Sequence, residues 1–278
     1  MTNGTDGDYP KSESGKPVAL EARRTEGDGR RYSPSVARNR DPILSVFRDH
    51  VCKGGHVLEV ASGTGEHGAY LTQALGDLYW TYSDIDAESR ASQKAWRDAS
   101  SHDRLAGPVV VDASKGQWGD VERPGYWDAI VSINMIHIAP FEAAFGLIAG
   151  AGRLLKPGGK LFLYGPFARN GEIAPSNAAF TESLQSRDSA WGVRDLDRQI
   201  IPLAEEVGLS VDLAVFDLLE QHVRRRYLHA WRQAVQQAGN VAEPEAPMLV
   251  GNTERIENFL ARVRNDRQRE NAKQGREV

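Results

Sequence analysis

The stretch HVLEVASGTGEHG, residues 56–68, decides the fold of this chain. Its first part, His56–Val60, has the apolar character of a short buried strand. Gly63, Gly65 and Gly68 follow, and helical spacing of apolar residues resumes directly after them. A strand, a G-x-G-x-x-G turn and a helix in this order predict a backbone loop that closely approaches a ligand at a helix N-terminus.

The chain on either side of this stretch alternates between strand and helix patterns. A parallel, doubly wound α/β sheet of the Rossmann-like type is therefore the predicted fold. Lys156-Pro157-Gly158-Gly159 is expected to stop the second of the following helices. The predicted strands are 78–82, 109–111, 127–133 and 160–164, and the predicted helices are 88–99 and 141–155.

The segment before the sheet divides into two parts. Residues 1–30 are rich in Gly, Ser and charged residues and are expected to form a flexible leader. Ser33-Pro34 has the sequence of a helix cap followed by a first-turn proline, and Asp41-Pro42 is expected to kink or divide the helix that follows. The main α/β domain is predicted to run from residue 31 to residue 217.

Beyond the sheet, the pattern becomes mostly helical. Residues 180–184 and 195–207 are predicted helices, and 210–216 is a predicted sixth strand. Residues 218–278 are predicted to form a helical C-terminal extension, which can cap the site or pair two subunits in a homodimer.

Composition excludes several classes of protein. The net charge of −4 and the pI of about 6.0 do not favour a nucleic-acid partner. Cys52 is the single cysteine, so no internal disulfide is possible and nothing points to secretion. No signal segment or membrane span is visible, and a cytoplasmic location is expected. No metal site is expected, because His222 and His229 lack the further ligands that a metal needs.

The glycine pattern alone fits both NAD and S-adenosylmethionine, and so does Asp84, which lies about 20 positions further on. Glu59 lies inside the strand, where a carboxylate suits the ammonium and sulfonium of S-adenosylmethionine and would repel the pyrophosphate of NAD. Asp112 ends a predicted strand, where it can accept from an adenine amino group. S-adenosylmethionine is therefore the predicted cofactor.

Two strings resemble motifs of the class I S-adenosylmethionine-dependent methyltransferases. VLEVASGTG, residues 57–65, is similar to their first motif, and LLKPGGKL, residues 154–161, is similar to the motif before their fifth strand. The departure is Ala61, where that motif usually has glycine. Alanine is expected to cost little there if its φ stays negative.

A closer resemblance is to the methyltransferase-like 26 family of predicted methyltransferases, over about residues 31–210. Its members usually end on a strand soon after the sixth, whereas helices are predicted here. The strings that carry the resemblance are RYSPS (31–35) with RN (38–39), SGTGEH (62–67), SDID (83–86), NMIHI (134–138), YGPF (164–167) and WGVRD (191–195).

The predicted cofactor residues come from these motifs. The alternatives are that Glu59 binds nearby amides, that Asp84 or Asp86 caps a helix, and that Asp112 is a turn residue. The predicted set is Arg38, Glu59, Ala61, Gly63, Gly65, His67, Asp84, Ile85, Asp112 and Asn134.

The predicted reaction is in-line transfer of the sulfonium methyl to an N, O or S nucleophile, which proximity and alignment accelerate. His137 and Asn134 are the predicted catalytic residues, with His137 as a base for an acceptor that stays protonated. The alternatives are a non-catalytic cofactor-binding protein and an NAD-dependent oxidoreductase. The predicted substrate residues, for a small-molecule acceptor, are Tyr32, Tyr164, Phe167, Trp191 and Arg194.

Overall fold

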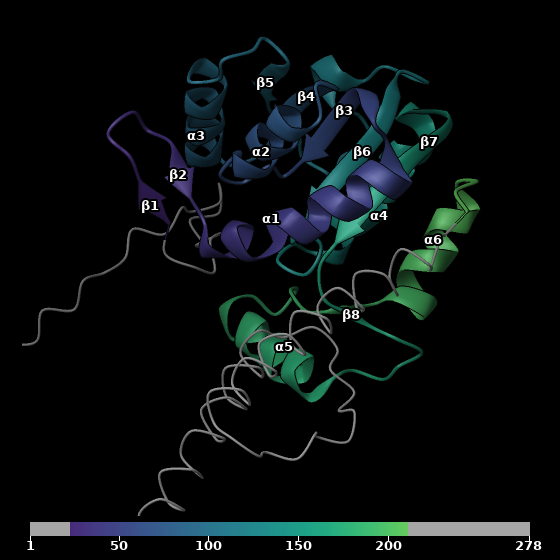
Figure 1. Ribbon diagram of the computed structural model, residues 1–278. Coiled ribbons are helices and arrows are strands. Elements are labelled where there is room, and N and C mark those ends of the chain that lie inside the picture. Colours follow the sequence, from purple (N-terminus) through teal and green to yellow (C-terminus); the bar gives the residue numbers. More distant parts are fainter. Residues whose placement is uncertain (1–22, 211–278) are drawn as a thin grey trace, which may run out of the picture. The chain divides into compact units, whose positions relative to one another are not determined.

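A five-stranded sheet forms the centre of the computed structural model, which describes residues 23–210 (Figure 1). The strand order is β5-β4-β3-β6-β7, and every pairing in this sheet is parallel. The predicted Rossmann-like fold is confirmed. The strands are β3 (Gly54–Val60), β4 (Asp77–Ser83), β5 (Leu105–Val109), β6 (Trp127–Ile133) and β7 (Leu155–Tyr164).

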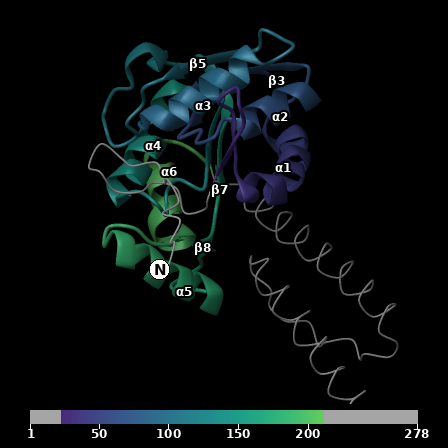
Figure 2. The same cartoon turned by 90° about the vertical axis from the view of Figure 1, so that its left-hand side faces the viewer.

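Helices cover both faces of the sheet, as the alternating pattern requires (Figures 1 and 2). One face carries α1 (Pro34–Val46), α2 (Glu66–Ala74) and α3 (Ala87–Asp98). The other carries α4 (Phe141–Leu154) and α6 (Ile201–Glu206).

Aromatic rings join α1 to the sheet. The π-helical turn η1 (Phe47–Val51) follows α1, and Phe47 is fully buried. Its ring centroid lies 5.9 Å from that of Trp80 on β4 and 6.0 Å from that of Phe162 on β7. This ring therefore fixes the N-terminal helix against strands that are far apart in the sequence.

Two expectations for the N-terminal segment need correction. Pro42 lies inside α1, and the helix continues past it to Val46, so the proline does not divide the helix. Residues 24–32, partly assigned to the leader, form a hairpin of β1 (Arg24–Thr25) and β2 (Arg31–Tyr32). The Arg30 guanidinium lies 5.0 Å from the Trp96 ring centroid and holds this hairpin on α3.

The third predicted strand was placed too late in the sequence. β5 ends at Val109, and Val110 is 59% exposed. Gly107 and Pro108 lie inside the strand although both residues usually interrupt one. They are tolerated because β5 is the edge strand and needs partners on one side only.

The connection from β5 to β6 contains only the short η2 turn (Gly119–Val121) and packs on α4. A Cβ on Gly146 would overlap the Ala113 carbonyl, and one on Gly150 would overlap the Trp118 ring. Glycines on α4 therefore make room for this connection. The helix α4 ends just before Lys156-Pro157-Gly158-Gly159, as expected. These four residues form an irregularity within β7, because β6 pairs with Leu155 and then directly with Lys160.

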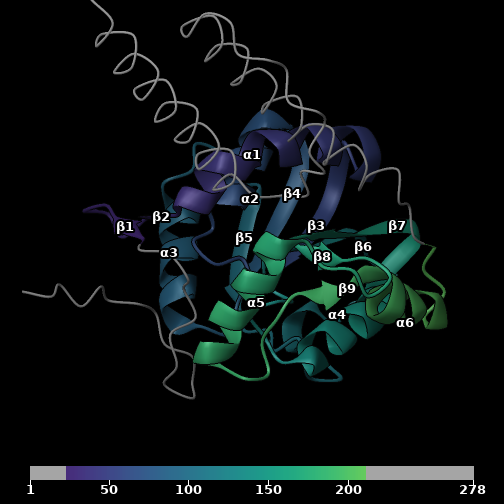
Figure 3. The same cartoon turned by 90° about the horizontal axis from the view of Figure 1, so that it is seen from below.

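The last described segment supplies a small layer beside the sheet (Figure 3). It contains β8 (Phe167–Ala168), α5 (Pro175–Arg187), β9 (Arg194–Asp195) and η3 (Leu196–Ile200), which runs into α6. The helices predicted at 180–184 and 195–207 are confirmed, although α5 is longer than predicted. The predicted strand 210–216 and the extension 218–278 lie outside the described residues, apart from Ser210.

Candidate active site

The glycine loop lies at the carboxyl end of β3, the central strand of the sheet. The connections after β3 and β6 leave toward opposite faces, so the strand order reverses at β3. Open α/β sheets bind ligands in the crevice at such a switch point. Ser132 on β6 donates through Oγ to the Val60 carbonyl at 3.1 Å and fixes the two strand ends together.

Left-handed backbone shapes the loop. Gly63 has φ +55° and Gly65, the N-cap of α2, has φ +85°. Ala61 has φ +60°, which corrects the expectation of a negative value. Alanine in this region costs about 1–2 kcal/mol. The chain holds this strain where the loop turns away from β3.

Gly68, the third glycine, faces the sheet. A Cβ there would lie 2.5 Å from Trp80 Nε1 and 2.5 Å from Tyr82 Cε1. Because no side chain fits, α2 can approach β4 closely, and Tyr82 donates its hydroxyl to the Gly65 carbonyl at 2.7 Å. The third glycine thus serves helix–sheet packing, while the first two shape the loop.

Glu59 is 1% exposed and lies behind the loop. Its Oε2 accepts from Trp80 Nε1 at 3.0 Å. Burial raises the pKa of Glu59 to about 8, while hydrogen bonds from Trp80 and Ser62 act in the opposite direction. At neutral pH, without a ligand, this group is therefore mostly protonated and not the ready negative charge that the sequence suggests.

Asp84 and Asp86 take separate roles at the end of β4. Asp86 is the N-cap of α3 and accepts from the Ser89 amide at 2.7 Å. Asp84 accepts from the Gly63 amide through Oδ2 and from the Asp86 amide through Oδ1, both at 2.9 Å. Burial raises the pKa of Asp84 to about 6. The capping alternative thus belongs to Asp86, and Asp84 faces the glycine loop.

Two predicted adenine-side residues lie nearby. Ile85 is half-buried, and its carbonyl accepts from Arg90 Nη1 at 2.7 Å. Asp112 lies three residues beyond β5 and accepts from the Ser114 amide at 2.9 Å. The turn that was the alternative for Asp112 is therefore present, and contact with a ligand stays a prediction.

A chain of polar side chains joins three elements next to the loop. His67 on α2 is buried, and its Nε2 lies 2.9 Å from Asn39 Oδ1 on α1. Burial lowers the pKa of His67 to about 4, so the neutral ring donates this bond. Burial raises the pKa of Tyr164 on β7, against a hydrogen bond from Asn39 and the positive charge of Arg38. The predicted residues Arg38, His67 and Tyr164 are thus brought together through Asn39.

The segment before α1 is tied to the loop by residues that sequence analysis missed. Ser92 on α3 donates to the Thr64 carbonyl at 2.7 Å and accepts from the Arg31 amide at 2.9 Å. Tyr32 lies with its ring edge-on to Trp96, at 5.0 Å between centroids. Glu66 accepts from the Ser33 amide at 3.1 Å.

Gln93 completes this polar face of α3. Its Nε2 donates to the Gly63 carbonyl at 3.0 Å, and its Oε1 is buried with no hydrogen-bond partner. Ser89, Ser92 and Gln93 are all buried at i, i+3 and i+4 spacing. A polar stripe at helical spacing, next to a glycine loop, was the signal that could have found them.

The predicted catalytic residues follow β6. Asn134 has φ +60°, and its amide donates to the Tyr164 carbonyl at 2.8 Å. His137 is 3% exposed, and its Nδ1 has no hydrogen-bond partner. A Cβ on Gly165 would lie 3.2 Å from His137 Nδ1 and 3.8 Å from Asn134 Oδ1. The Nδ1 atom of His137 and the Oδ1 atom of Asn134 thus both lie next to Gly165, where there is no side chain.

Three predicted substrate residues belong to the layer around β8 and β9. Phe167 and Trp191 are buried. Arg194 donates to the carbonyls of Ile136 at 3.1 Å, of Ala139 at 2.7 Å and of Ala190 at 2.8 Å. The structure thus assigns packing to the two rings and backbone binding to the guanidinium, and a substrate contact for these three stays a prediction.

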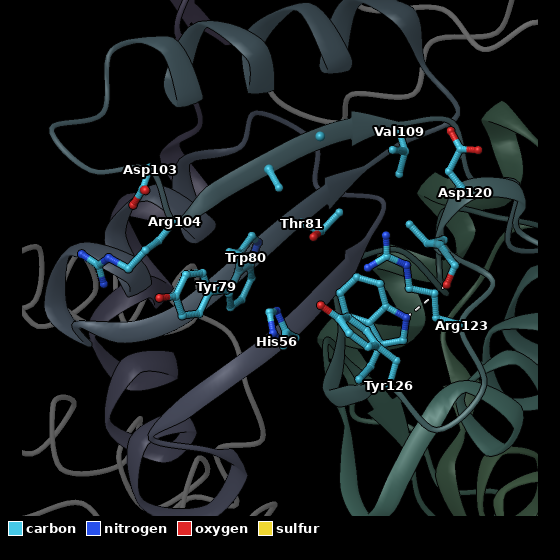
Figure 4. A pocket seen from close by; sticks show the side chains of 14 residues that line it. His56, Tyr79, Trp80, Thr81, Asp103, Arg104, Val109, Asp120, Arg123 and Tyr126 are labelled. Carbon is cyan, nitrogen blue, oxygen red and sulfur yellow. Dashed lines mark hydrogen bonds between the residues drawn. The ribbon is translucent and has the colours of Figure 1, made fainter.

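A separate cavity of about 320 Å³ lies on the sheet away from this site (Figure 4). His56 stacks there between Tyr79, at 5.3 Å, and Tyr126, at 4.7 Å. None of the glycine-loop residues lines it, and the strand residues that line it lie in the middle or amino-terminal halves of their strands, except Val109 at the end of β5. The cavity is therefore not the crevice at the glycine loop.

Residues 23–210 lack the features of a metal centre and of a membrane-spanning helix. No group of three or more His, Cys, Asp or Glu side chains in this part could hold a metal ion. None of the helices in this part is long and apolar enough to cross a membrane.

Solved structures with this fold include several methyltransferases. An O-methyltransferase family protein from Burkholderia thailandensis is 18% identical over 64% of this chain and 53% of its own, with a TM-score of 0.54. PigF with SAH is 15% identical over 63% and 51%, with a TM-score of 0.52. Haemonchus contortus phosphoethanolamine N-methyltransferase 2, in complex with phosphomonomethylethanolamine and S-adenosylhomocysteine, is 16% identical over 83% and 48%, with a TM-score of 0.50.

This chain spans about half the length of those three structures. Among curated proteins, the hybrid PKS-NRPS synthetase thnA of Trichoderma harzianum is 26% identical over 141 residues, which are 50% of this chain and 3% of the synthetase. The family model described as "Protein of unknown function (DUF938)" matches residues 30–216, and the chain belongs to that family.

Proposed function

We propose that this chain is an S-adenosylmethionine-dependent methyltransferase that methylates an N, O or S nucleophile of a small-molecule acceptor. The observation that carries the proposal is the left-handed loop Ala61–Gly65 at the switch point of a class I methyltransferase fold, with Asp84 on the adjacent strand end. Neighbours of this fold that were solved with S-adenosylhomocysteine support the choice of cofactor. The finer resemblance to the methyltransferase-like 26 family belongs to the same proposal.

The residues at the loop fit this cofactor. The nearest atom to a Cβ on Gly63 would be Arg23 Nη2 at 3.7 Å, so the loop leaves room for a ligand on that side. Gln93 Oε1 is a buried acceptor without a partner. Asp84 would bind the ribose hydroxyls, and Ala61, Gly63 and Gly65 would line the methionine end.

The cofactor supplies an activated methyl group, so the protein's task is mainly to align the acceptor. Asn134 and His137 lie at the adjoining strand end, where the acceptor would bind. Burial and the charge of Arg194 lower the pKa of His137 to about 4, so its ring is neutral at pH 7 and can accept a proton. Such a weak base suits an acceptor that loses its proton easily.

The remaining parts of the proposal concern the setting of the reaction. We infer a cytoplasmic enzyme that acts without nucleic acid, membrane or metal and that forms a homodimer through residues 218–278. The net charge of −4 supports an enzyme that acts without nucleic acid.

Calorimetry tests the cofactor, with S-adenosylmethionine, S-adenosylhomocysteine and NAD titrated separately into the full chain. The proposal expects the first two to bind and NAD to bind far more weakly; tighter binding of NAD would replace it with an oxidoreductase. Transfer of a labelled methyl group to fractions of a small-molecule extract tests catalysis. Cofactor binding without transfer to any fraction would favour a non-catalytic binding protein.

A further inference from the structure

The loop that carries His137 is held by the segment 190–194 from outside the sheet. The Gly192 amide donates to the His137 carbonyl at 3.0 Å. Arg194 binds the carbonyls on either side of it, those of Ile136 and Ala139, at 3.1 Å and 2.7 Å. Three carbonyls of residues 136–139 are thus fixed by a segment more than 50 positions further along the chain.

Arg194 itself is firmly placed. Its guanidinium also donates to the Ala190 carbonyl at 2.8 Å and lies 5.5 Å from the Phe141 ring centroid. Burial lowers its pKa, and the carboxylate of Glu142 acts in the opposite direction. Backbone carbonyls thus occupy Nε and both donors of Nη2, which is the side of the fork that a carboxylate or phosphate would bind in a two-pronged contact, and only the two donors of Nη1 remain.

The imidazole of His137 lies next to the ring of Phe180 and to Gly165. The Phe180 ring of α5 packs against it at 5.6 Å between centroids. Nδ1 is buried without a partner beside Gly165, and Asn134 Oδ1 is near the same glycine. An unpartnered buried nitrogen is costly, so the ring keeps this orientation only because its loop is fixed.

We propose that Arg194 is a positioning residue: with the Gly192 amide, it fixes the loop 136–139 so that Nδ1 of His137 faces the acceptor beside Asn134 and Gly165. The inference rests on the proposed function. It moves Arg194 from substrate binding to positioning, and it assigns the substrate end of the site to the strip between Asn134, His137 and Gly165.

Arg194 also acts on the charge state of the ring. The pKa of His137 is lowered first by burial and then by the positive charge of Arg194. Glu142 faces Arg194, so it moderates the charge that the ring experiences. Removing the guanidinium is therefore expected to raise the pKa of His137 as well as to loosen its loop.

The experiment compares Arg194→Gln with Arg169→Gln in the full chain. Arg169 follows β8, in the same layer, but its guanidinium binds Asp197 at 2.8 Å. Histidine titration by NMR and amide hydrogen exchange of residues 136–139 are measured without cofactor or acceptor. In Arg194→Gln, the His137 midpoint should rise and the loop amides should exchange about tenfold faster, as expected for the loss of a buried hydrogen bond. Arg169→Gln should change neither value.

Two further measurements separate positioning from general damage. Ethylguanidinium added to Arg194→Ala should partly restore slow exchange, because it can occupy the vacated place of the guanidinium. If Arg194→Gln does not fold, Arg194→Lys, which can still bind one carbonyl, is measured in its place and should show smaller changes in the same direction. Wild-type exchange and an unchanged His137 midpoint in a folded Arg194 variant would overturn the proposal.

The two proposals can fail separately. The calorimetric titration of S-adenosylmethionine decides the cofactor, whereas the NMR measurements need no ligand. If the Arg194 variants show the expected changes but S-adenosylmethionine does not bind, the role of Arg194 in fixing the loop would stand and the methyltransferase proposal would be wrong.

Discussion

Glu59 has a different character in the fold than its position in the sequence suggests. The sequence places a carboxylate inside the strand before the glycine loop, where it is expected to attract a cation, yet in the folded chain this group is buried and accepts from Trp80 Nε1 at 3.0 Å. Desolvation then dominates, and the pKa of Glu59 is raised to about 8. Electrostatic attraction of the cofactor must therefore begin with ionisation of a buried acid.

The first prediction concerns stability and pH. Glu59 binds a proton in the folded chain up to about pH 8 but only up to about pH 4.5 when unfolded. Between these values Glu59 holds more protons in the folded state, so its contribution to the free energy of unfolding falls as pH rises. Below about pH 6.5 the buried His67 and His137, whose pKa values are lowered to about 4, act in the opposite direction, so the fall should appear between pH 6.5 and pH 8, by about 2 kcal/mol. Glu59→Gln keeps an acceptor for Trp80 and should remove most of this slope, as measured by urea unfolding from pH 6.5 to pH 8.5. Glu182→Gln on exposed α5 is the control and should keep the wild-type slope; equal slopes in all three proteins would contradict the assignment.

The second prediction concerns the cofactor's charge. If the cations of S-adenosylmethionine bind near Glu59, they should lower its pKa and release up to about 0.9 proton at pH 7, since a group of pKa 8 is about 90% protonated there. S-adenosylhomocysteine has no sulfonium and should release less. Calorimetry in buffers of different ionisation enthalpy measures the number of protons. Glu59→Gln should release close to none, and equal release by both ligands would disconnect Glu59 from the sulfonium.

The third prediction concerns the strained alanine. Ala61 has φ +60°, a conformation that glycine adopts without steric cost. Ala61→Gly should therefore stabilise the fold by about 0.5–1 kcal/mol, because relief of strain exceeds the added entropy of the unfolded chain. Denaturant unfolding measures the change. Ala113→Gly, at a buried alanine whose φ is not positive, should destabilise instead.

At the scale of elements, α3 connects the loop to the N-terminal segment. Ser92 on its inner face bridges the Thr64 carbonyl and the Arg31 amide. Trp96, one turn later, donates through Nε1 to the Arg31 carbonyl at 3.1 Å. Two successive turns of α3 thus bind both the glycine loop, at Thr64, and the strand β2, at Arg31.

The fourth prediction tests this connection. Ser92→Ala should leave the Arg31 amide without its acceptor, so exchange of that amide should accelerate and S-adenosylmethionine should bind several-fold more weakly. The free energy of unfolding should fall by about 1–3 kcal/mol, the usual cost of leaving a buried donor unsatisfied. Hydrogen exchange followed by mass spectrometry measures the Arg31 amide, and calorimetry measures the affinity for S-adenosylmethionine. Ser100→Ala, beyond the end of α3, is the matched control and should alter neither.

The elements that sequence predicted well are those whose burial is uniform. The strands β3 and β6 are buried on both faces, and α4 has one long apolar face, so their patterns are strong. β5 was misplaced because an edge position allowed Gly107 and Pro108 inside it. The hairpin β1–β2 depends on contacts with Trp96, and no local pattern reveals such contacts.

The candidate site also has one part that the sequence could predict and one part that it could not. Backbone geometry of the loop and the strand-end acids followed from motifs, since strand order alone gathers Gly63, Asp84 and Asn134 at one edge. The side chains that support them did not, because Ser92, Gln93 and Asn39 act through distant partners. The surroundings of Glu59 and Arg194 could not be predicted for a related reason: burial and backbone partners, neither visible in a motif, decide the charge and the contacts of such a group.

For the molecule as a whole, ligand binding and folding are linked through the sheet edge. The Gly63 amide depends on Asp84 on the neighbouring strand, and the end of β6 is fixed to β3 through Ser132. A cofactor that binds across these strand ends would therefore stabilise the whole described domain and not one loop. A ligand at one hundred times its dissociation constant adds about 2.7 kcal/mol to the free energy of unfolding.

The fifth prediction uses this linkage. S-adenosylmethionine at that concentration should raise the Tm of the wild-type chain by about 5–10 °C. Asp84→Asn retains one amide acceptor but loses its charge and one oxygen, so its own Tm should fall and the rise caused by the cofactor should largely disappear. Asp86→Asn, two residues away, keeps a capping side chain and should keep the full rise. Because each rise is measured against the same variant without ligand, loss of intrinsic stability does not mimic loss of binding. An equal rise in both variants would place the cofactor away from the end of β4.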